Sequence, residues 1–393
     1  MSFKDVIKQQ QHNIRDYGMY IAFVAIVIFF AITTKGLFVS SRNIGNLVNA
    51  MSYIAVLAVG MTLVIVIRHI DLSVGYLAGF LGAITAIALK YWHLPLFLTM
   101  LLVLVVGLCA GLLTAFLVAQ MRIPAFVATL AGWLGYRGAL QLATRSTGTI
   151  IIENDTFNKL GNGFIPDIPG ITILPGIHKV TLLLGIIAII LFIVGEINNR
   201  RKTQAYNFAV PHINMFILKL VFLSAIIAVI TWVLAGYQGL SWAAVILIFI
   251  VLLYDYITTK TVVGRHIYAV GGNPEAAQLN GISVKRITYI VFGSMGLLTA
   301  LSGMLYASWL RSATTIAGQG MEFDAIAAAF VGGVAVAGGV GKVTGSILGA
   351  LVMASLTNGM NLLGWGIEIQ YIVRALVLAL AVIFDVQTRR AAK

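Results

Sequence analysis

Charged residues are scarce in this chain of 393 residues, because Asp, Glu, Lys and Arg make up only 10% of it. A typical soluble protein carries about 25%. Hydrophobic residues make up 60% of the chain. A water-soluble fold cannot bury that much apolar surface, so the composition excludes the set of soluble domains that the length alone would suggest. We expect an all-α fold, a polytopic transmembrane helix bundle that forms a single integral-membrane domain over residues 1–393.

Cysteine and clustered metal ligands are scarce too. The only cysteine, Cys109, lies in an apolar run, so the chain has neither a disulfide framework nor a cysteine-based metal site. The six histidines are scattered, and no zinc-binding pair, nucleophile elbow or Cys–His set occurs. We therefore expect no catalytic residue, no bound metal and no cofactor in this chain.

Acidic residues are outnumbered, with 13 against 26 basic residues and a net charge of +13. The basic residues stand in short clusters between apolar runs, which is typical of cytoplasmic loops and not of a nucleic-acid-binding surface. We expect no nucleic-acid partner. The clusters that we place in the cytoplasm contain Lys4, Lys8 and Arg15; Arg200, Arg201 and Lys202; Lys260, Arg265, Lys285 and Arg286; and Arg389, Arg390 and Lys393.

Twelve apolar runs are long enough, or nearly so, to cross about 30 Å of hydrocarbon. Twelve crossings place every basic cluster inside and both termini in the cytoplasm, whereas an odd number does not. The runs cover residues 19–34, 47–67, 72–89, 96–119, 127–143, 180–195, 215–235, 241–257, 287–307, 324–337, 345–358 and 369–384.

The two runs at 324–337 and 345–358 are the shortest. Each has about 14 residues, which at 1.5 Å per residue falls short of a full crossing. The alternative to 12 spans is therefore ten spans plus a re-entrant pair that meets at GGVGKVTG, residues 338–345. Glycines four residues apart permit close helix contact. They stand at Gly75 and Gly79, at Gly107 and Gly111, and at Gly341, Gly345 and Gly349.

GGVGKVTG has a superficial likeness to a phosphate-binding loop. Val336 stands where that motif needs its first glycine, and Val343 stands where it needs a magnesium-binding hydroxyl. No soluble strand precedes the segment. We expect a tight turn between closely packed helices and no nucleotide site.

Between the apolar runs lies one polar, glycine-rich stretch, GRHIYAVGGNPEAAQLNGISVKR, at residues 264–286. Asn273 is a good N-cap, Pro274 suits the first helical position, and Gly281 supplies a left-handed stop. Glu275 faces the positive end of the helix dipole. The stretch predicts a helix of about two turns outside the bilayer, which is too short to be stable alone in water and needs a surface to contact.

This stretch resembles the conserved cytoplasmic loop in the permease subunits of bacterial ATP-binding cassette (ABC) importers for ribose, xylose and multiple monosaccharides. HIDLSVGYLAG at residues 69–79 and the Gly-rich segment at residues 318–364 are similar to two further family signatures. The resemblance implies that 260–286 is the cytoplasmic coupling loop and that its short helix seats in an ATPase subunit. The implied ATPase-coupling residues are Arg265, Gly271, Gly272, Asn273, Pro274, Glu275, Ala276, Ala277, Leu279 and Gly281.

The same resemblance implies an inner-membrane permease for monosaccharides such as xylose, galactose, arabinose or ribose. The implied partners, besides membrane lipid and the sugar, are a second copy of this chain, an ABC ATPase that holds ATP and magnesium, and a periplasmic sugar-binding protein. That protein would dock on the loops at 144–179 and 308–322. The resemblance also implies that residues 180–235 are a two-span insertion relative to shorter ribose-type members, as in the longer xylose and multiple-monosaccharide permeases.

Ionisable residues at the edges of apolar runs are expensive in a membrane unless they are paired or hydrated, which makes them candidates for the translocation pathway. Asp71 and Ser73 are expected to cap a broken helix that begins at Leu72, with Arg68 or His69 as the counter-charge, either beside the sugar route or as a purely structural cap. Arg374 lies inside the last apolar run and needs an acidic partner, Asp324 or Glu322.

One alternative function stays open. A secondary sugar transporter driven by protons or sodium needs a buried carboxylate relay and no ATPase, and Asp71 with Asp324 could serve as that relay. A membrane-embedded enzyme would need a nucleophile, base or metal set, which the sequence lacks.

Overall fold

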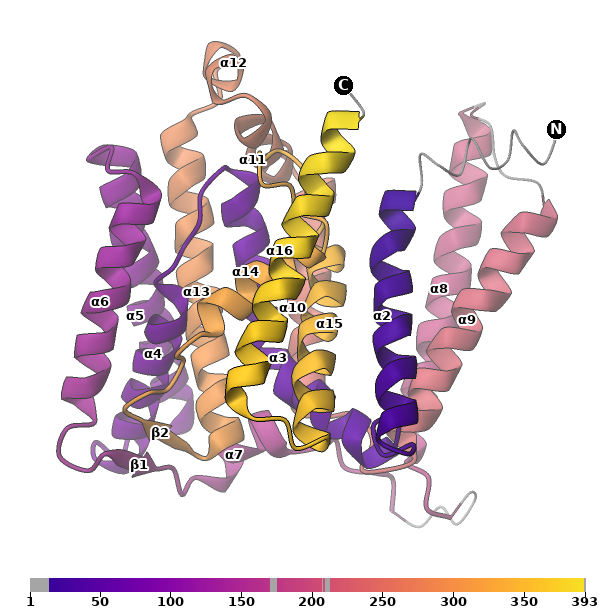
Figure 1. Cartoon of the computed structure of the whole chain (residues 1–393), viewed down its shortest axis with the longest axis horizontal. Helices are drawn as coiled ribbons and strands as arrows, with labels where there is room; N and C mark the ends of the chain where they lie inside the picture. Colours follow the sequence, from indigo (N-terminus) through magenta and orange to yellow (C-terminus); the bar gives the residue numbers. More distant parts are fainter. Residues whose placement is uncertain (1–13, 170–174, 207, 209–212, 392–393) are drawn as a thin grey trace.

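The computed structural model describes residues 14–169, 175–206, 208 and 213–391, and it is predominantly helical (Figure 1). The first half contains α2 (Ile14–Thr33), α3 (Ser41–Val66), α4 (Val74–Lys90), α5 (Leu96–Ala115), the π-helical turn η1 (Phe116–Gln120), α6 (Ala125–Ala143), β1 (Thr149–Ile151), α7 (Asp155–Asn162) and α8 (Lys179–Ala205). The second half contains α9 (Ile213–Ala235), α10 (Trp242–Lys260), α11 (Val262–Gly272), α12 (Pro274–Leu279), α13 (Val284–Leu310), β2 (Ser312–Thr314), α14 (Met321–Val331), α15 (Val343–Leu362) and α16 (Ile367–Ala391).

Seven helices in this part of the chain are long and apolar enough to cross a membrane. They are α3, α5 with η1, α8, α9, α10, α13 and α15, and two shorter apolar helices occupy Tyr20–Thr33 and Val74–Lys90. The helical, membrane-spanning class is thus confirmed, while the count of 12 stays a prediction. The basic residues Lys4, Lys8 and Lys393 lie outside the described residues.

Helices α3 and α13 form the centre of the bundle. They are the two most enclosed of the seven candidate spans: 83% and 72% of the residues in their 18-residue apolar stretches are buried. Helices α4, α5, α14 and α15 pack around them. Gly107 and Gly111 of α5 meet the backbone of α13, where an added Cβ would overlap the carbonyl oxygens of Gly296 and Phe292. The predicted close contact at this glycine pair is confirmed.

The two short C-terminal runs fold unequally. α14 has 11 residues, as a broken helix should, but α15 has 20 and is long enough to span by itself. The prediction of a short second run was wrong because Asn358 does not end the helix; its side chain pairs with Asn43 at 2.8 Å. Gly345 and Gly349 of α15 pack on the backbone of α14, so the predicted tight packing is confirmed.

The end of the bundle opposite α12 carries a small sheet (Figure 1). β1 and β2 pair antiparallel, with Ile150 opposite Ala313. α7 follows β1 in the chain and packs on the end of α13, where the Asn162 side-chain amide donates to the backbone oxygens of Ser308 and Trp309 at 2.7 and 3.0 Å. The sheet therefore joins two loops that are more than 150 residues apart in the sequence, which apolar patterning alone does not reveal.

Helices α8 and α9 form a pair at one side of the molecule (Figure 1). Only 11% and 6% of the residues in their 18-residue apolar stretches are buried, so the pair contributes little to the core. Lys219 pairs with Glu196 across it at 2.8 Å. The two ends of the pair meet, because the His178 backbone N–H donates to the Ala235 carbonyl at 2.8 Å.

α2 begins, and α16 ends, at the end of the bundle that carries α11 and α12 (Figure 1). The described ends of the chain therefore share a side with the predicted coupling loop. This arrangement agrees with an even number of crossings.

Candidate functional site

α12 is the most projecting helix at its end of the bundle (Figure 1). Its start follows local rules: the Asn273 side chain accepts from the Ala276 backbone N–H at 3.0 Å, and Pro274 occupies the first turn. The chain then leaves the helix at Gly281, whose φ of +81° favours glycine. The predicted short helix between the Asn273 cap and the Gly281 stop is thus confirmed, and it covers Pro274–Leu279.

One apolar side chain on α12 has no cover. Leu279 is 89% exposed, whereas Ala277 of the same helix is 5% exposed and packs inward. Gln278 and Glu275 are exposed as well. A projecting leucine on a short helix is a suitable anchor for a partner protein, because burial of its side chain would contribute about 2 kcal/mol.

α11, which precedes α12, fills the stretch that the sequence analysis treated as a polar loop. The Thr261 side chain caps it by accepting from the Gly264 backbone N–H at 3.2 Å, and Ile267 and Val270 are buried. Arg265 is exposed on this helix. The signal that could have found α11 is the threonine cap followed by two apolar residues three positions apart.

α11 is tied to the rest of the bundle at a contact of three backbone segments. These segments are 66–68 after α3, 271–272 at the end of α11 and 338–341 between α14 and α15; we call their contact the junction. Gly339 donates its backbone N–H to the Val66 carbonyl at 2.8 Å. Gly271 allows the approach, since a Cβ there would overlap the Val66 oxygen.

Side chains reinforce the junction. Arg68, which has a φ of +67°, donates from Nε to the Gly271 carbonyl at 2.6 Å and from Nη2 to the Gly272 carbonyl. The Tyr268 hydroxyl donates to the Gly341 carbonyl at 2.6 Å. Burial raises the pKa of Tyr268, and the Asp255 carboxylate adds to the rise, so the phenol stays protonated and remains a donor.

Asp71 differs from the prediction in its partner. Its carboxylate is 4% exposed and accepts from the backbone N–H and hydroxyl of Ser73 at 2.9 and 2.6 Å. No basic side chain in the described chain forms an ion pair with it, because the Arg68 guanidinium turns to the junction and His69 lies against Phe292. The predicted counter-charge is therefore wrong, and α4 begins at Val74, two residues after the expected start.

Asp324 and Arg374 come together as the sequence predicted. Arg374 Nη1 lies 3.2 Å from both carboxylate oxygens of Asp324. The two side chains are 22% and 15% exposed, for Arg374 and Asp324 respectively. The pairing is confirmed, and its place in a pathway stays a prediction.

The structure also assembles a cluster that the sequence analysis missed. The Trp133 indole N–H donates to Glu322 Oε1 at 2.9 Å, and Arg137 lies over the rings of Trp133 and Tyr76. The available signal was Arg137 itself, because a charge inside an apolar run is the same feature that singled out Arg374.

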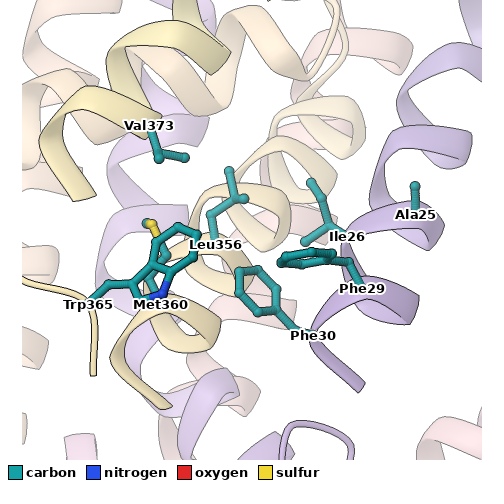
Figure 2. Close-up of a pocket in the computed structure, with 8 residues that line it drawn as sticks. All are labelled: Ala25, Ile26, Phe29, Phe30, Leu356, Met360, Trp365 and Val373. Carbon is teal, nitrogen blue, oxygen red and sulfur yellow. The ribbon is translucent and has the colours of Figure 1, made fainter. Parts of the chain in front are cut away.

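Two cavities lie away from the junction. One, of about 350 Å³, is lined only by apolar and aromatic side chains of α2, α15, α16 and the turn before α16 (Figure 2). The other, of about 190 Å³, is polar and lies beside α7 at the end opposite α12, next to Arg311. In the part of the chain that the structure describes, no three His, Cys, Asp or Glu side chains are grouped as metal ligands would be.

Comparison with known proteins places this arrangement among transport proteins. The family described as "Branched-chain amino acid transport system / permease component" matches residues 43–382. The chain is 37% identical to the xylose transport system permease protein XylH of Haemophilus influenzae over 385 residues, which are 98% of this chain and 100% of that protein.

Two further relatives agree. The chain is 36% identical to XylH of Escherichia coli strain K12 over 378 residues, covering 96% and 93% of the two chains. It is 33% identical to the ribose import permease protein RbsC of Haemophilus influenzae over 369 residues, covering 93% and 92%. No solved structure matches the chain.

Proposed function

Because this chain belongs to the family of branched-chain amino acid transport system permease components, we propose that it is the membrane permease subunit of an ATP-driven ABC importer of monosaccharides. The relatives named for xylose and ribose transport support a five-carbon sugar as cargo. Arabinose is also a five-carbon sugar, whereas galactose is a six-carbon monosaccharide. The chain is a transport subunit and not an enzyme, so ATP and magnesium bind to a partner ATPase.

The observation that carries this proposal is the projecting α12 together with the junction. Leu279 is uncovered at the tip, and α12 follows directly on Gly271 and Gly272, whose carbonyls accept from Arg68. A force applied to α12 therefore reaches the break between α3 and α4 and the turn between α14 and α15 over a short path. Such a link is what an external, nucleotide-driven subunit needs.

We place the chain in the bacterial inner membrane as a multi-pass homodimer. Its termini and α12 face the cytoplasm, and it crosses the membrane 12 times. The coupling loop covers 260–286, and 180–235 is a two-span insertion. The shared side of α2's start, α16's end and α12 supports this orientation (Figure 1).

A periplasmic sugar-binding protein docks on the opposite end. The two loops expected to receive it, 144–179 and 308–322, are joined there by the β1–β2 pair. A surface built from both loops would move as one unit with the end of α13, and would carry the arrival of loaded binding protein into the bundle.

Reconstitution decides between this function and gradient-driven transport. The purified chain, its ATPase and its binding protein are placed in proteoliposomes, and uptake of labelled xylose is measured with and without ATP. We expect uptake to need ATP and both partners. Uptake by the chain alone under a proton or sodium gradient would show that the ABC assignment is wrong.

A further inference from the structure

The missed cluster on α6 holds a charge at an unusual place. Arg137 is exposed and lies six residues before the end of α6 at Ala143, which is about 9 Å along the helix. An arginine at this depth is costly against lipid, and one near a helix end normally extends towards the closer membrane surface.

Arg137 extends the other way. Its guanidinium lies 5.6 Å from the ring centroid of Trp133, one turn deeper, and 5.8 Å from that of Tyr76 in the first turn of α4. Within the described chain the Arg137 guanidinium forms no hydrogen bond and no ion pair. Only its contacts with the two aromatic rings hold it in place, and its N–H donors have no acceptor. Water or a hydrogen-bonding ligand must satisfy them.

The ring beside Arg137 is held in a fixed orientation. The indole N–H of Trp133 donates to Glu322, whose carboxylate is 1% exposed. The second oxygen, Oε2, has no hydrogen-bond partner in the described chain and packs against Gly75, where a Cβ would overlap it. Tyr76 meets the Trp133 ring at a centroid distance of 4.9 Å and an angle of 78°. Three helices thus position one half-buried indole.

Trp133 and Arg137 are four residues apart and share one flank of α6. Leu130, seven residues before Arg137 and also exposed, continues this flank deeper into the membrane. An indole ring beside free guanidinium donors has the chemistry that recognises a sugar, because the ring packs against its C–H groups and the donors bind its hydroxyls.

The geometry points to the Leu130–Arg137 flank of α6 as a water-lined stretch of the sugar pathway, in which Trp133 and Arg137 contact the monosaccharide. Glu322 is a positioning residue that fixes the indole. This inference rests on the proposed function, since it names where the cargo of that importer touches the chain. We expect the affinity of this contact for the sugar to be low, because a separate binding protein selects the sugar.

Transport by the complete importer in proteoliposomes tests the contact. We expect Arg137→Gln to lower the ratio of xylose taken up to ATP hydrolysed about tenfold, in line with the loss of a charged hydrogen-bond donor, and Arg137→Lys to retain part of it. The control is Arg201→Gln, an exposed arginine near the end of α8, which should keep the wild-type ratio. Wild-type uptake tests the proposed function separately, so a normal ratio in Arg137→Gln overturns only this inference.

Thiol labelling tests the water-lined flank without altering the cluster. In a Cys109→Ser background, Leu130→Cys should react with a charged, water-soluble thiol reagent in the assembled importer. The control is Val105→Cys. Val105 on α5 is 50% exposed, but we expect it to face lipid and not the sugar pathway, so the introduced cysteine should not react. If Leu130→Cys is as unreactive as Val105→Cys, the flank contacts lipid or protein and the inference is wrong.

Discussion

At the scale of single residues, Arg68 shows how far a charge can be predicted from its neighbours in sequence. Proximity to Asp71 favoured an ion pair, but that carboxylate instead accepts two hydrogen bonds from Ser73, both at Oδ1. The free guanidinium instead binds carbonyls about 200 residues away. Sequence identified both residues as unusual, yet only the folded backbone could supply the partners. The Arg374–Asp324 pair was predictable because few acidic residues were available to choose from.

We predict that Arg68→Ala separates ATP hydrolysis from transport. Loss of two charged hydrogen bonds, each worth about 1.5–3 kcal/mol, should loosen the junction and lower sugar uptake per ATP about tenfold. Arg122→Ala is the matched control, because Arg122 is also an arginine with positive φ, at +57°, but lies outside the junction. Equal losses in the two variants would mean that backbone strain, and not the junction, causes the effect.

At the scale of elements, α12 could be predicted almost to the residue because a cap, a proline and a glycine act locally. α11 could not, since its identity as a helix depends on burying Ile267 and Val270 against the bundle. The length of α15 was underestimated for the same reason. A polar residue such as Asn358 indicates the end of an apolar run in the sequence, but in the fold its side chain is paired with Asn43. Local rules predict ends, and tertiary partners decide which helices continue.

The exposed tip of α12 leads to a prediction about assembly. Leu279→Ser should leave the permease as stable as before, because the side chain is 89% exposed in the isolated chain. It should weaken ATPase binding about 30-fold, which corresponds to about 2 kcal/mol of lost apolar burial. Gln278→Ser is the control on the same helix. The measurement is the Kd between detergent-purified subunits, and an unchanged Kd for Leu279→Ser would place the contact elsewhere.

At the scale of the whole molecule, apolar runs predicted the helical bundle but not which distant segments meet. The junction joins residues 66–68, 271–272 and 338–341, and the small sheet joins 149–151 with 312–314. These contacts are made largely by backbone groups and glycines. Such groups leave no hydrophobic pattern in the sequence, so the contacts could not be predicted from it. They are also the contacts that link the α12 end, the core and the opposite end.

The α8–α9 pair is the part of the molecule least involved in that linkage, and we predict that it can be removed. Its ends already meet through the His178–Ala235 hydrogen bond, so deleting 179–235 and joining His178 to Gly236 should close without strain. Because two helices are lost together, the later helices keep their orientation. A deletion of α9 alone, 213–235, is the control, since it inverts every following helix and should abolish insertion.

The expected result of the double deletion is a chain that inserts, binds its ATPase and imports sugar in an ATP-dependent manner, with a Tm lowered by a few degrees from the lost contacts with α3. The deletion would uncover few apolar residues of the core, because only 11% and 6% of the residues in the 18-residue apolar stretches of α8 and α9 are buried. Loss of transport in a properly assembled importer would instead show that the pair takes part in the transport cycle. In that case its exposed surface must contact the second protomer or another subunit during turnover.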